Sequence, residues 1–375
     1  MRLCVIAGLG AAVLASFGFA QDGPERSRGA AALAPAQTSF RLSDAEFRAL
    51  VTRLSEPGGT FVTENIVSNE IAFQDVLPEL QRRTRQGAYI GVAPEQNLSY
   101  IAALKPPIAF IVDLQRGNLL LQLLYKALVE TSSDRADFMS HLFARARPAG
   151  VNGQASAADL FAAYRSVRVS TPLAATTLSA VLGRLKGHGF SLSAADRRGI
   201  EKIHRAIYEG GPDLRGDFGR NIAIPSWVPS YAEMLSQADP NGVNQSFLGS
   251  EANFSTLKAY ESDNLIVPVV GDFAGDKALK AVGEYVRGRG ITVGTFYTSN
   301  VEDYLFRSDA WTRFFRNVAS LPLDDDSMFV RTYFTSGIEG MREYVAPIRS
   351  MLSAWGNGEI KSYDDLIARS RVPRS

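Results

Sequence analysis

Cysteine is almost absent from this sequence. The only one, Cys4, lies among the first twenty residues, so a chain processed after residue 20 has no cysteine for disulfides or thiol catalysis. Histidine is scarce too, and the three residues have no metal-ligand spacing to one another. We therefore predict no metal site and assign surface or packing roles to the three: His141, His188 and His204.

An excess of charge of one sign is also missing. The chain of 375 residues has 40 Lys and Arg against 39 Asp and Glu, a formal charge of +1, and it has no long basic run. This balance gives no footprint of nucleic-acid binding. With 46% apolar and 21% charged residues, the composition is that of a globular protein.

Several catalytic signatures do not occur. The sequence contains no GxSxG elbow, HExxH motif or Walker loop. The run Asp324 to Asp326 lacks the alternate spacing of a calcium loop, and we predict a solvated turn there. A pair of glycosidase carboxylates stays open, because such partners need not be close in sequence.

The N-terminus is typical of an exported protein. Arg2 precedes an apolar segment from Leu3 to Phe19, and small residues follow at the place where a signal peptidase cuts. We predict a signal peptide at residues 1–20 and a flexible linker at 21–41, with a periplasmic or secreted mature protein and no stable membrane insertion after cleavage. The alternative is an uncleaved membrane anchor, although the segment is short for a span.

The stretch from Gly87 to Asn118 predicts a strand, a tight turn, a helix and a second strand. Tyr89 to Val92 and Ile108 to Leu114 are the apolar runs, and Asn97 to Leu104 is the helix between them. So compact a unit favours a parallel, right-handed crossover. Ligands of such sheets lie beyond the carboxyl ends of the strands.

The rest of the chain predicts one α/β domain over residues 42–375. A helix begins at Ser43 with a capping box to Glu46, and a largely helical insertion occupies about residues 147–260. Three further strands follow the insertion, and a late helix is predicted from Ile338 to Trp355. The strands are Leu265 to Val270, Ile291 to Tyr297 and Met328 to Phe334.

Four strand ends collect polar residues that a parallel sheet would bring to one edge. Asp113 could accept hydrogen bonds from a ribose diol, and the amides at the first turn could face an anion. Pro94 and Glu95 weaken the case for a phosphate, because proline removes a donor and the carboxylate repels. The candidate binding residues at these ends are Gly91, Glu95, Asn97, Asp113, Asp272 and Asn300.

Two other polar groups have alternative readings. The segment from Thr63 to Glu70, with Glu64 and Asn65, is either turn and capping chemistry or a loop that lies over the pocket. The pair Glu251 and Asn253 repeats the spacing of Glu95 and Asn97. These pairs are either coincident helix caps or four groups that face one cleft and bind a polyhydroxylated or amide-bearing ligand.

Four motifs carry a resemblance to a known family: ENIVSNE, YIGVAPEQNLSYIAALKPPIAFIVDLQRGN, NLIVPVVGDFAGDKALKAVGEYV and FYTSNVEDYLF. Together they resemble a family of uncharacterised bacterial proteins whose fold is similar to that of class I S-adenosylmethionine-dependent methyltransferases. The resemblance implies a Rossmann-like α/β sheet with helices on both faces. It places Gly91 in the first glycine motif, Asp113 at the ribose, Asp272 near the adenine and Asn300 beside the substrate. The sequence departs from the methyltransferase pattern at GVAPEQN, which replaces a glycine-rich turn.

Two function classes follow, and whether the protein is an enzyme stays open. The first hypothesis is an exported protein that binds a small polar ligand at the strand ends without methyl transfer. The alternative is an S-adenosylmethionine-dependent methyltransferase. Export favours the first, because the periplasm and the exterior do not normally hold pools of that cofactor.

Overall fold

A computed structural model describes residues 40–61, 63–84, 87–216, 224, 227–334 and 341–371. The chain divides into two units, residues 1–39 and 40–375. The predicted signal peptide and nearly all of the predicted linker lie outside the described residues, so both stay predictions.

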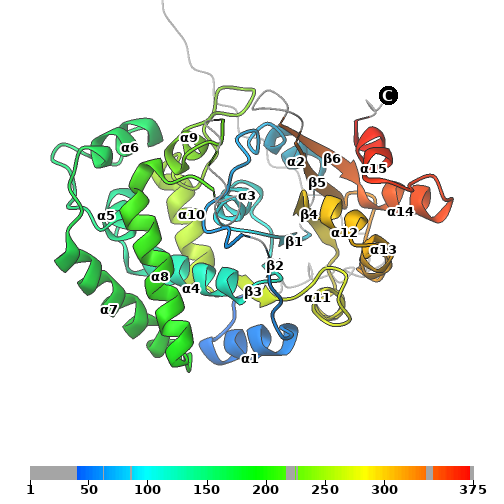
Figure 1. Cartoon of the computed structure of the whole chain (residues 1–375), viewed down its shortest axis with the longest axis horizontal. Helices are drawn as coiled ribbons and strands as arrows, with labels where there is room; N and C mark the ends of the chain where they lie inside the picture. Colours follow the sequence, from blue (N-terminus) through cyan, green and yellow to red (C-terminus); the bar gives the residue numbers. More distant parts are fainter. Residues whose placement is uncertain are drawn as a thin grey trace, which may run out of the picture. The chain divides into compact units, whose positions relative to one another are not determined.

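The second unit is an α/β structure (Figure 1). Its sheet strands are β1 Ala88–Gly91, β2 Ala109–Asp113, β3 Ile266–Val270, β4 Val293–Ser299, β5 Met328–Tyr333 and β6 Arg342–Pro347. Its helices are α1 Asp44–Leu54, α2 Leu77–Arg83, α3 Gln96–Leu104, α4 Arg116–Thr131, α5 Arg135–Phe143, α6 Ala157–Arg165, α7 Thr171–Gly187, α8 Ala194–Gly210, the 3-10 helix η1 Gly211–Asp213, α9 Tyr231–Leu235, α10 Glu251–Ser262, α11 Ala278–Gly288, α12 Val301–Arg307, α13 Trp311–Ala319, α14 Ile348–Gly356 and α15 Tyr363–Ser370.

The strands form one six-stranded sheet in the order β3-β2-β1-β4-β5-β6. All neighbours are parallel except β5 and β6. This mostly parallel order is compatible with a Rossmann-like fold and confirms the predicted α/β class. The five parallel strands coincide with the five predicted apolar runs.

The prediction of a helix from Ile338 to Trp355 is wrong for residues 342–347. These residues form β6, which pairs antiparallel with β5 from Tyr333↔Arg342 to Met328↔Pro347, and only then does α14 begin. Pro347 was the available signal, because a proline disfavours helical geometry in the residue before it. The start of the predicted helix, residues 338–340, lies outside the described part of the chain.

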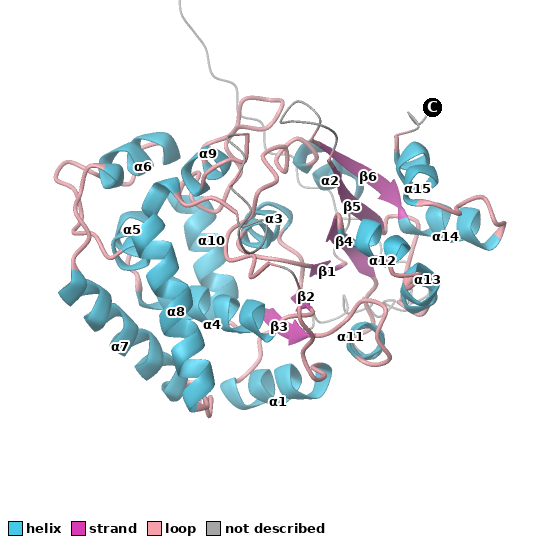
Figure 2. Ribbon diagram, viewed as in Figure 1, coloured by secondary structure: helices cyan, strands magenta, loops and turns pink. Residues whose placement is uncertain are grey.

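Helices cover both faces of the sheet (Figure 2). Helices α3, α4 and α10 pack together on one face, and α11 and α13 pack together on the other. Between residues 147 and 260 the elements of the described chain are α6, α7, α8, η1, α9 and the greater part of α10. The apolar cores of β1 to β5 are buried between the two layers, which fixes the strand ends in place.

A buried ionic network ties α1 and α7 to α4. The ammonium of Lys126 lies 2.8 Å from Glu130, and both side chains are almost fully buried. Glu130 also accepts from His188 at 2.7 Å, and the second ring nitrogen of His188 lies 2.7 Å from Asp44. His188 therefore has a packing role, because its two nitrogens connect the first helix of the domain to the fourth.

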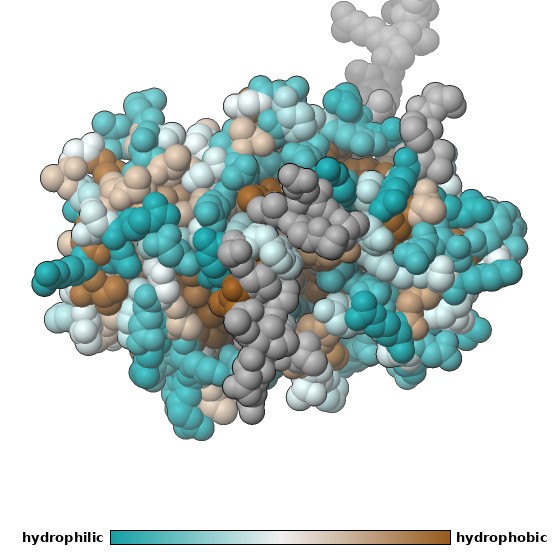
Figure 3. Space-filling model, turned by 45° about the horizontal axis from the view of Figure 1, so that its top comes forward, coloured by the Kyte–Doolittle hydropathy of each residue, from teal (hydrophilic) through white to brown (hydrophobic). Residues whose placement is uncertain are grey.

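The described part of the chain contains no helix that is both long and apolar enough to cross a membrane. The face drawn in Figure 3 is mostly hydrophilic, with hydrophobic residues reaching the surface in small groups.

Candidate functional site

The carboxyl ends of β1 and β4 are the point where the strand order changes direction. From β1 the chain continues to β2 and β3 on one side, whereas β4 and β5 lie on the other. Ligands of open α/β sheets bind beside such a switch point. We therefore describe this strand-end edge as the candidate site, together with the residues that surround it.

The turn between β1 and α3 is closed by the side chain of Asn97. Its Oδ1 accepts a hydrogen bond from the hydroxyl of Tyr89 at 2.8 Å. Its Nδ2 donates to three carbonyl oxygens of the turn, those of Val92 (2.7 Å), Ala93 (3.1 Å) and Pro94 (2.8 Å). Asn97 is fully buried, so its amide serves the turn itself.

The side chain of Asn97 also explains why a glycine is required at position 91. A Cβ atom added at this position would lie 1.9 Å from Oδ1 of Asn97 and 2.7 Å from the ring of Tyr89. In a glycine-rich nucleotide turn the absent side chain leaves room for a ligand. In this turn, the Asn97 amide occupies that room.

The first amide of α3 is engaged by the segment that precedes α2. The backbone amide of Gln96 donates to the hydroxyl of Ser68 at 3.3 Å, and the amide of Ser68 donates to both carboxylate oxygens of Glu95 at 3.1 Å. Glu95 is fully buried. Burial raises the pKa of Glu95 to about 7, although hydrogen bonds from its own amide and from Ser68 lower it. The site thus carries a buried carboxyl group that titrates near neutrality.

Asp113 lies at the end of β2 and is half-buried. Its Oδ1 accepts from the amide of Gln115 at 2.8 Å. Burial raises the pKa of Asp113 to about 6, against the lowering effect of hydrogen bonds from the amides of Gln115 and Ala93. The carboxyl group therefore lies against the β1–α3 turn, and its hydrogen-bond partners among the described residues are backbone amides.

The two remaining strand ends carry Asp272 and Asn300, both half-buried. Oδ1 of Asp272 accepts from the amide of Ala274 at 2.8 Å, and its own amide donates to Glu56 at 2.8 Å. Asn300 precedes α12, with its Oδ1 3.4 Å from the hydroxyl of Ser299. Sheet topology thus brings Gly91, Asp113, Asp272 and Asn300 to one edge.

Glu70 joins the segment before α2 to the switch point. Its Oε2 accepts from the hydroxyl of Tyr297 at 2.5 Å and from Nε2 of Gln96 at 2.9 Å, and its Oε1 accepts from the hydroxyl of Ser299. Ser299 ends β4 with a left-handed backbone, φ 53°. Through these hydrogen bonds, two residues of the polar segment 63–70, Ser68 and Glu70, are connected to the ends of β1 and β4.

A second carboxyl group, that of Glu343 on β6, lies close enough to Glu70 to feel its negative charge. Oε1 of Glu343 accepts from the hydroxyl of Thr332 at 2.7 Å. Burial, followed by the negative charge of Glu70, raises the pKa of Glu343 well above its usual range. Glu343 therefore holds its proton at a pH where an exposed glutamate has lost it.

Replacing Glu343 with Gln should therefore make the protein more stable at alkaline pH. In the wild type, the stability due to this group is fully present below the ordinary glutamate pKa and is lost as the pH rises toward the raised pKa. Glutamine stays neutral and keeps one donor. We expect the melting midpoints of Glu343→Gln and wild type to agree near pH 5 and to separate, with the variant higher, at pH 8.

The exposed Glu284→Gln on α11 is the control for that prediction. Its midpoint should follow the wild type at both pH values. A Glu343→Gln midpoint that stays parallel to the wild type across the range would contradict the proton assignment.

The structure places Glu64 and Asn65 away from these bonds. Glu64 is exposed and pairs with Nζ of Lys202 on α8 at 2.6 Å. Oδ1 of Asn65 accepts from the hydroxyl of Thr63 at 2.7 Å. Both are surface and turn contacts in the described residues.

Glu251 and Asn253 connect α10 to its surroundings. Glu251 accepts from Nε of the buried Arg135 at 2.9 Å, and Nδ2 of Asn253 donates to the carbonyl oxygen of Ser246 at 2.9 Å. Among the described residues, no hydrogen bond or ion pair joins these two residues to Glu95 or Asn97. The repeat in the sequence thus marks two helix starts with different partners.

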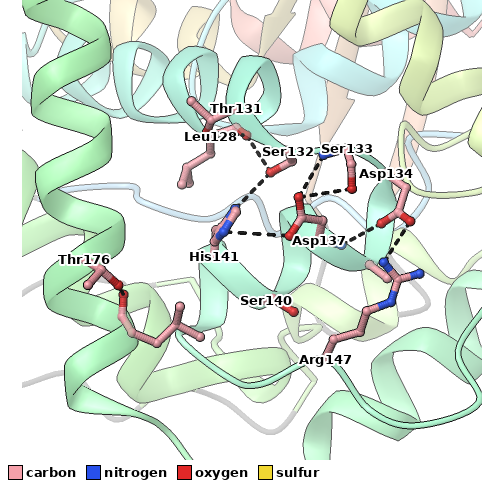
Figure 4. Close-up of polar contacts among 12 residues, drawn as sticks. Leu128, Thr131, Ser132, Ser133, Asp134, Asp137, Ser140, His141, Arg147 and Thr176 are labelled. Atoms are coloured by element: carbon pink, nitrogen blue, oxygen red, sulfur yellow. Dashed lines mark hydrogen bonds and ion pairs between the residues drawn. The ribbon is translucent and has the colours of Figure 1, made fainter.

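A serine, a histidine and an aspartate line up at the corner of α4 and α5 (Figure 4). Oγ of Ser132 lies 3.2 Å from Nδ1 of His141, and Nε2 of His141 lies 3.7 Å from Asp137. However, Ser132 is fully buried and its hydroxyl donates to the carbonyl oxygen of Leu128 at 2.7 Å. The hydroxyl therefore ends helix α4, and the group is a structural corner.

Comparison with protein families gives a match over more than half of the chain. The model of a family described as Domain of unknown function (DUF7790) matches residues 65–153 and 200–354. No curated protein matches the sequence. The matched ranges include the whole strand-end site: the β1–α3 turn, Asp113, Glu70, Asp272, Asn300 and Glu343.

Proposed function

This chain belongs to the DUF7790 family, and from that premise we propose that it binds a small polar ligand at the strand-end edge beside Asp113, without methyl transfer. The observation that carries the proposal is the position of Asp113. A half-buried acceptor at the switch edge, with backbone amides as recorded partners, suits a hydroxyl or amine of a ligand.

The closed β1–α3 turn supports the part of the proposal that excludes methyl transfer. A methyl donor with an amino-acid carboxylate needs free amides and space at this turn. Here Asn97 takes the space at Gly91, and the first amide of α3 donates to Ser68. Glu95 adds a carboxyl group at the place where an anion would approach.

A methyltransferase is the second candidate. The mostly parallel sheet and the acids at the ends of β2 and β3, Asp113 and Asp272, favour it, since the sequence resemblance implies such a sheet and both acid positions. Calorimetry of the full chain with S-adenosylmethionine separates the candidates. We expect no saturable heat at millimolar cofactor, whereas saturable binding that Asp113→Ala abolishes would establish the second candidate instead.

The ligand itself can be detected through stability. A ligand that binds only the folded state raises the melting midpoint. The wild type as isolated should therefore melt at a higher temperature than the same protein after unfolding in urea, dialysis and refolding. Asp113→Ala should show no such difference, while the exposed Asp276→Ala keeps it. Equal wild-type midpoints before and after stripping would contradict the proposal.

We also propose that the protein is exported to the periplasm or the exterior. The support is the sequence pattern alone, a basic residue followed by the apolar segment Leu3 to Phe19 and small residues. Mass spectrometry of the N-terminus of the protein from its own cells should find a start near residue 21. An intact N-terminus would contradict cleavage.

A further inference from the structure

Asn118, on the first turn of α4, has a buried side chain without partners. It is 5% exposed, yet neither Nδ2 nor Oδ1 has a hydrogen-bond partner among the described residues. Buried amide groups without hydrogen-bond partners are rare. A donor or acceptor that loses its hydrogen bonds to water on folding and gains no new partner lowers the stability of the folded state. The residue lies five positions after Asp113, which ends β2.

Gln122 repeats the feature one turn further along α4. It is 3% exposed, and its Oε1 also has no partner among the described residues. Its Nε2 donates to the carbonyl oxygen of Ala93 at 3.4 Å, in the β1–α3 turn. Because residues four apart share one face of a helix, Asn118 and Gln122 lie on the face that meets this turn. Asp113 accepts a hydrogen bond from the amide of the same Ala93.

A second buried asparagine shows what a structural role looks like in this protein. Asn317 on α13 is 3% exposed, and its Nδ2 donates to the carbonyl oxygens of Phe273 at 2.8 Å and Gly275 at 2.7 Å. Its amide pins a loop. The side chain of Asn118 makes no hydrogen bond to the described chain, so stability alone does not account for an amide at this position.

We propose that Asn118 and Gln122 are ligand-binding residues, and that together with Asp113 they select a ligand with a hydrogen-bond donor next to an acceptor, such as a primary carboxamide or the amino edge of an adenine. An asparagine amide matches such a pair with two parallel hydrogen bonds. Gln122 Oε1 and the Asp113 carboxylate accept further donors of the ligand. The inference deepens the proposed function and rests on it.

The first test compares Asn118→Leu with Asn317→Leu in the full chain stripped of ligand by refolding. Leucine has the same branched arrangement of side-chain heavy atoms as asparagine and removes the unmet polar atoms. We expect Asn118→Leu to raise the melting midpoint by about 2 °C or more, and Asn317→Leu to lower it. If both variants lower the melting midpoint, the only partner of Asn118 is a structural one, such as a bound water, and the inference is overturned.

The second test uses probes on the same stripped proteins. Nicotinamide and adenine at millimolar concentration should raise the midpoint of the wild type, and the N,N-dimethyl amide of nicotinic acid, which lacks the donor, should not. Asn118→Leu and Gln122→Leu should each lose the response, and Asn317→Leu should keep it. A response of Asn118→Leu equal to that of the wild type, or no wild-type response to either probe, contradicts the ligand class.

The outcomes separate this inference from the proposal on which it rests. If the wild type loses no ligand-dependent stability on stripping, the proposed function fails. Suppose instead that stripping lowers the melting midpoint of the wild type. If it lowers the midpoint of Asn118→Leu by the same amount, only the assignment of Asn118 fails.

Discussion

Replacing Arg331 with Met is expected to lower the free energy of unfolding by about 3 to 5 kcal/mol. The Arg331 side chain on β5 is fully buried and makes two bonds to Glu302 at the start of α12, Nε to Oε2 at 2.5 Å and Nη2 to Oε1 at 3.0 Å. Methionine fills much of the volume but leaves the Glu302 carboxylate, 1% exposed, without its counter-charge. Urea unfolding followed by circular dichroism at pH 7 measures the loss.

Two variants control for the loss of the arginine itself. The double change Glu302→Met with Arg331→Met removes both charges and should recover most of the stability. Arg165→Met breaks the exposed pair with Asp213, which is 2.8 Å apart, and should change the unfolding free energy by less than about 1 kcal/mol. An Arg331→Met loss as small as that of Arg165→Met would show that the buried pair does not hold α12 to the sheet.

The stability of the protein should fall as the pH rises from 4.5 to 8, and Glu95→Gln should remove a large part of that fall. Burial raises the pKa of Glu95 from 4.5 to about 7, so the folded state holds this proton more tightly than the unfolded chain. Its contribution is fully present below pH 4.5 and is lost as the pH rises through 7. A shift of this size corresponds to about 3 kcal/mol.

Denaturant unfolding at several pH values tests this expectation. The free energy of unfolding of Glu95→Gln, relative to that of the wild type, should increase by about 3 kcal/mol between pH 4.5 and 8. The control is Glu79→Gln on α2, a partly exposed residue that pairs with Arg83, which should leave the pH dependence unchanged. Parallel curves for Glu95→Gln and wild type would mean that Glu95 is not protonated in the folded protein.

Much of the sheet could be predicted from the sequence because buried parallel strands are continuous apolar runs. The runs at Ile108 to Leu114 and Leu265 to Val270 are examples, and both became strands. β6 could not be predicted in this way. Its residues from Arg342 are exposed or half-buried at one end, and their strand geometry comes from pairing with β5.

The site was predictable only where chain order decides position. Asp113 and Asp272 follow strands, so the parallel topology alone places them at one edge. The partnership of Glu70 with Glu343 depends on an antiparallel strand that the sequence did not reveal. The missing partners of Asn118 are a property of its surroundings, and no local pattern distinguishes this asparagine from an ordinary helix residue.

Native mass spectrometry of the full-length protein, isolated from its own cells without denaturation, tests the central claim most directly. We predict that the wild type carries an additional small-molecule mass, and that the mass is absent from Asp113→Ala and present in Asp276→Ala purified in the same way. A wild type that has only the mass of its polypeptide, or an Asp113→Ala protein that keeps the same ligand in the same proportion, would contradict a ligand site at the strand ends.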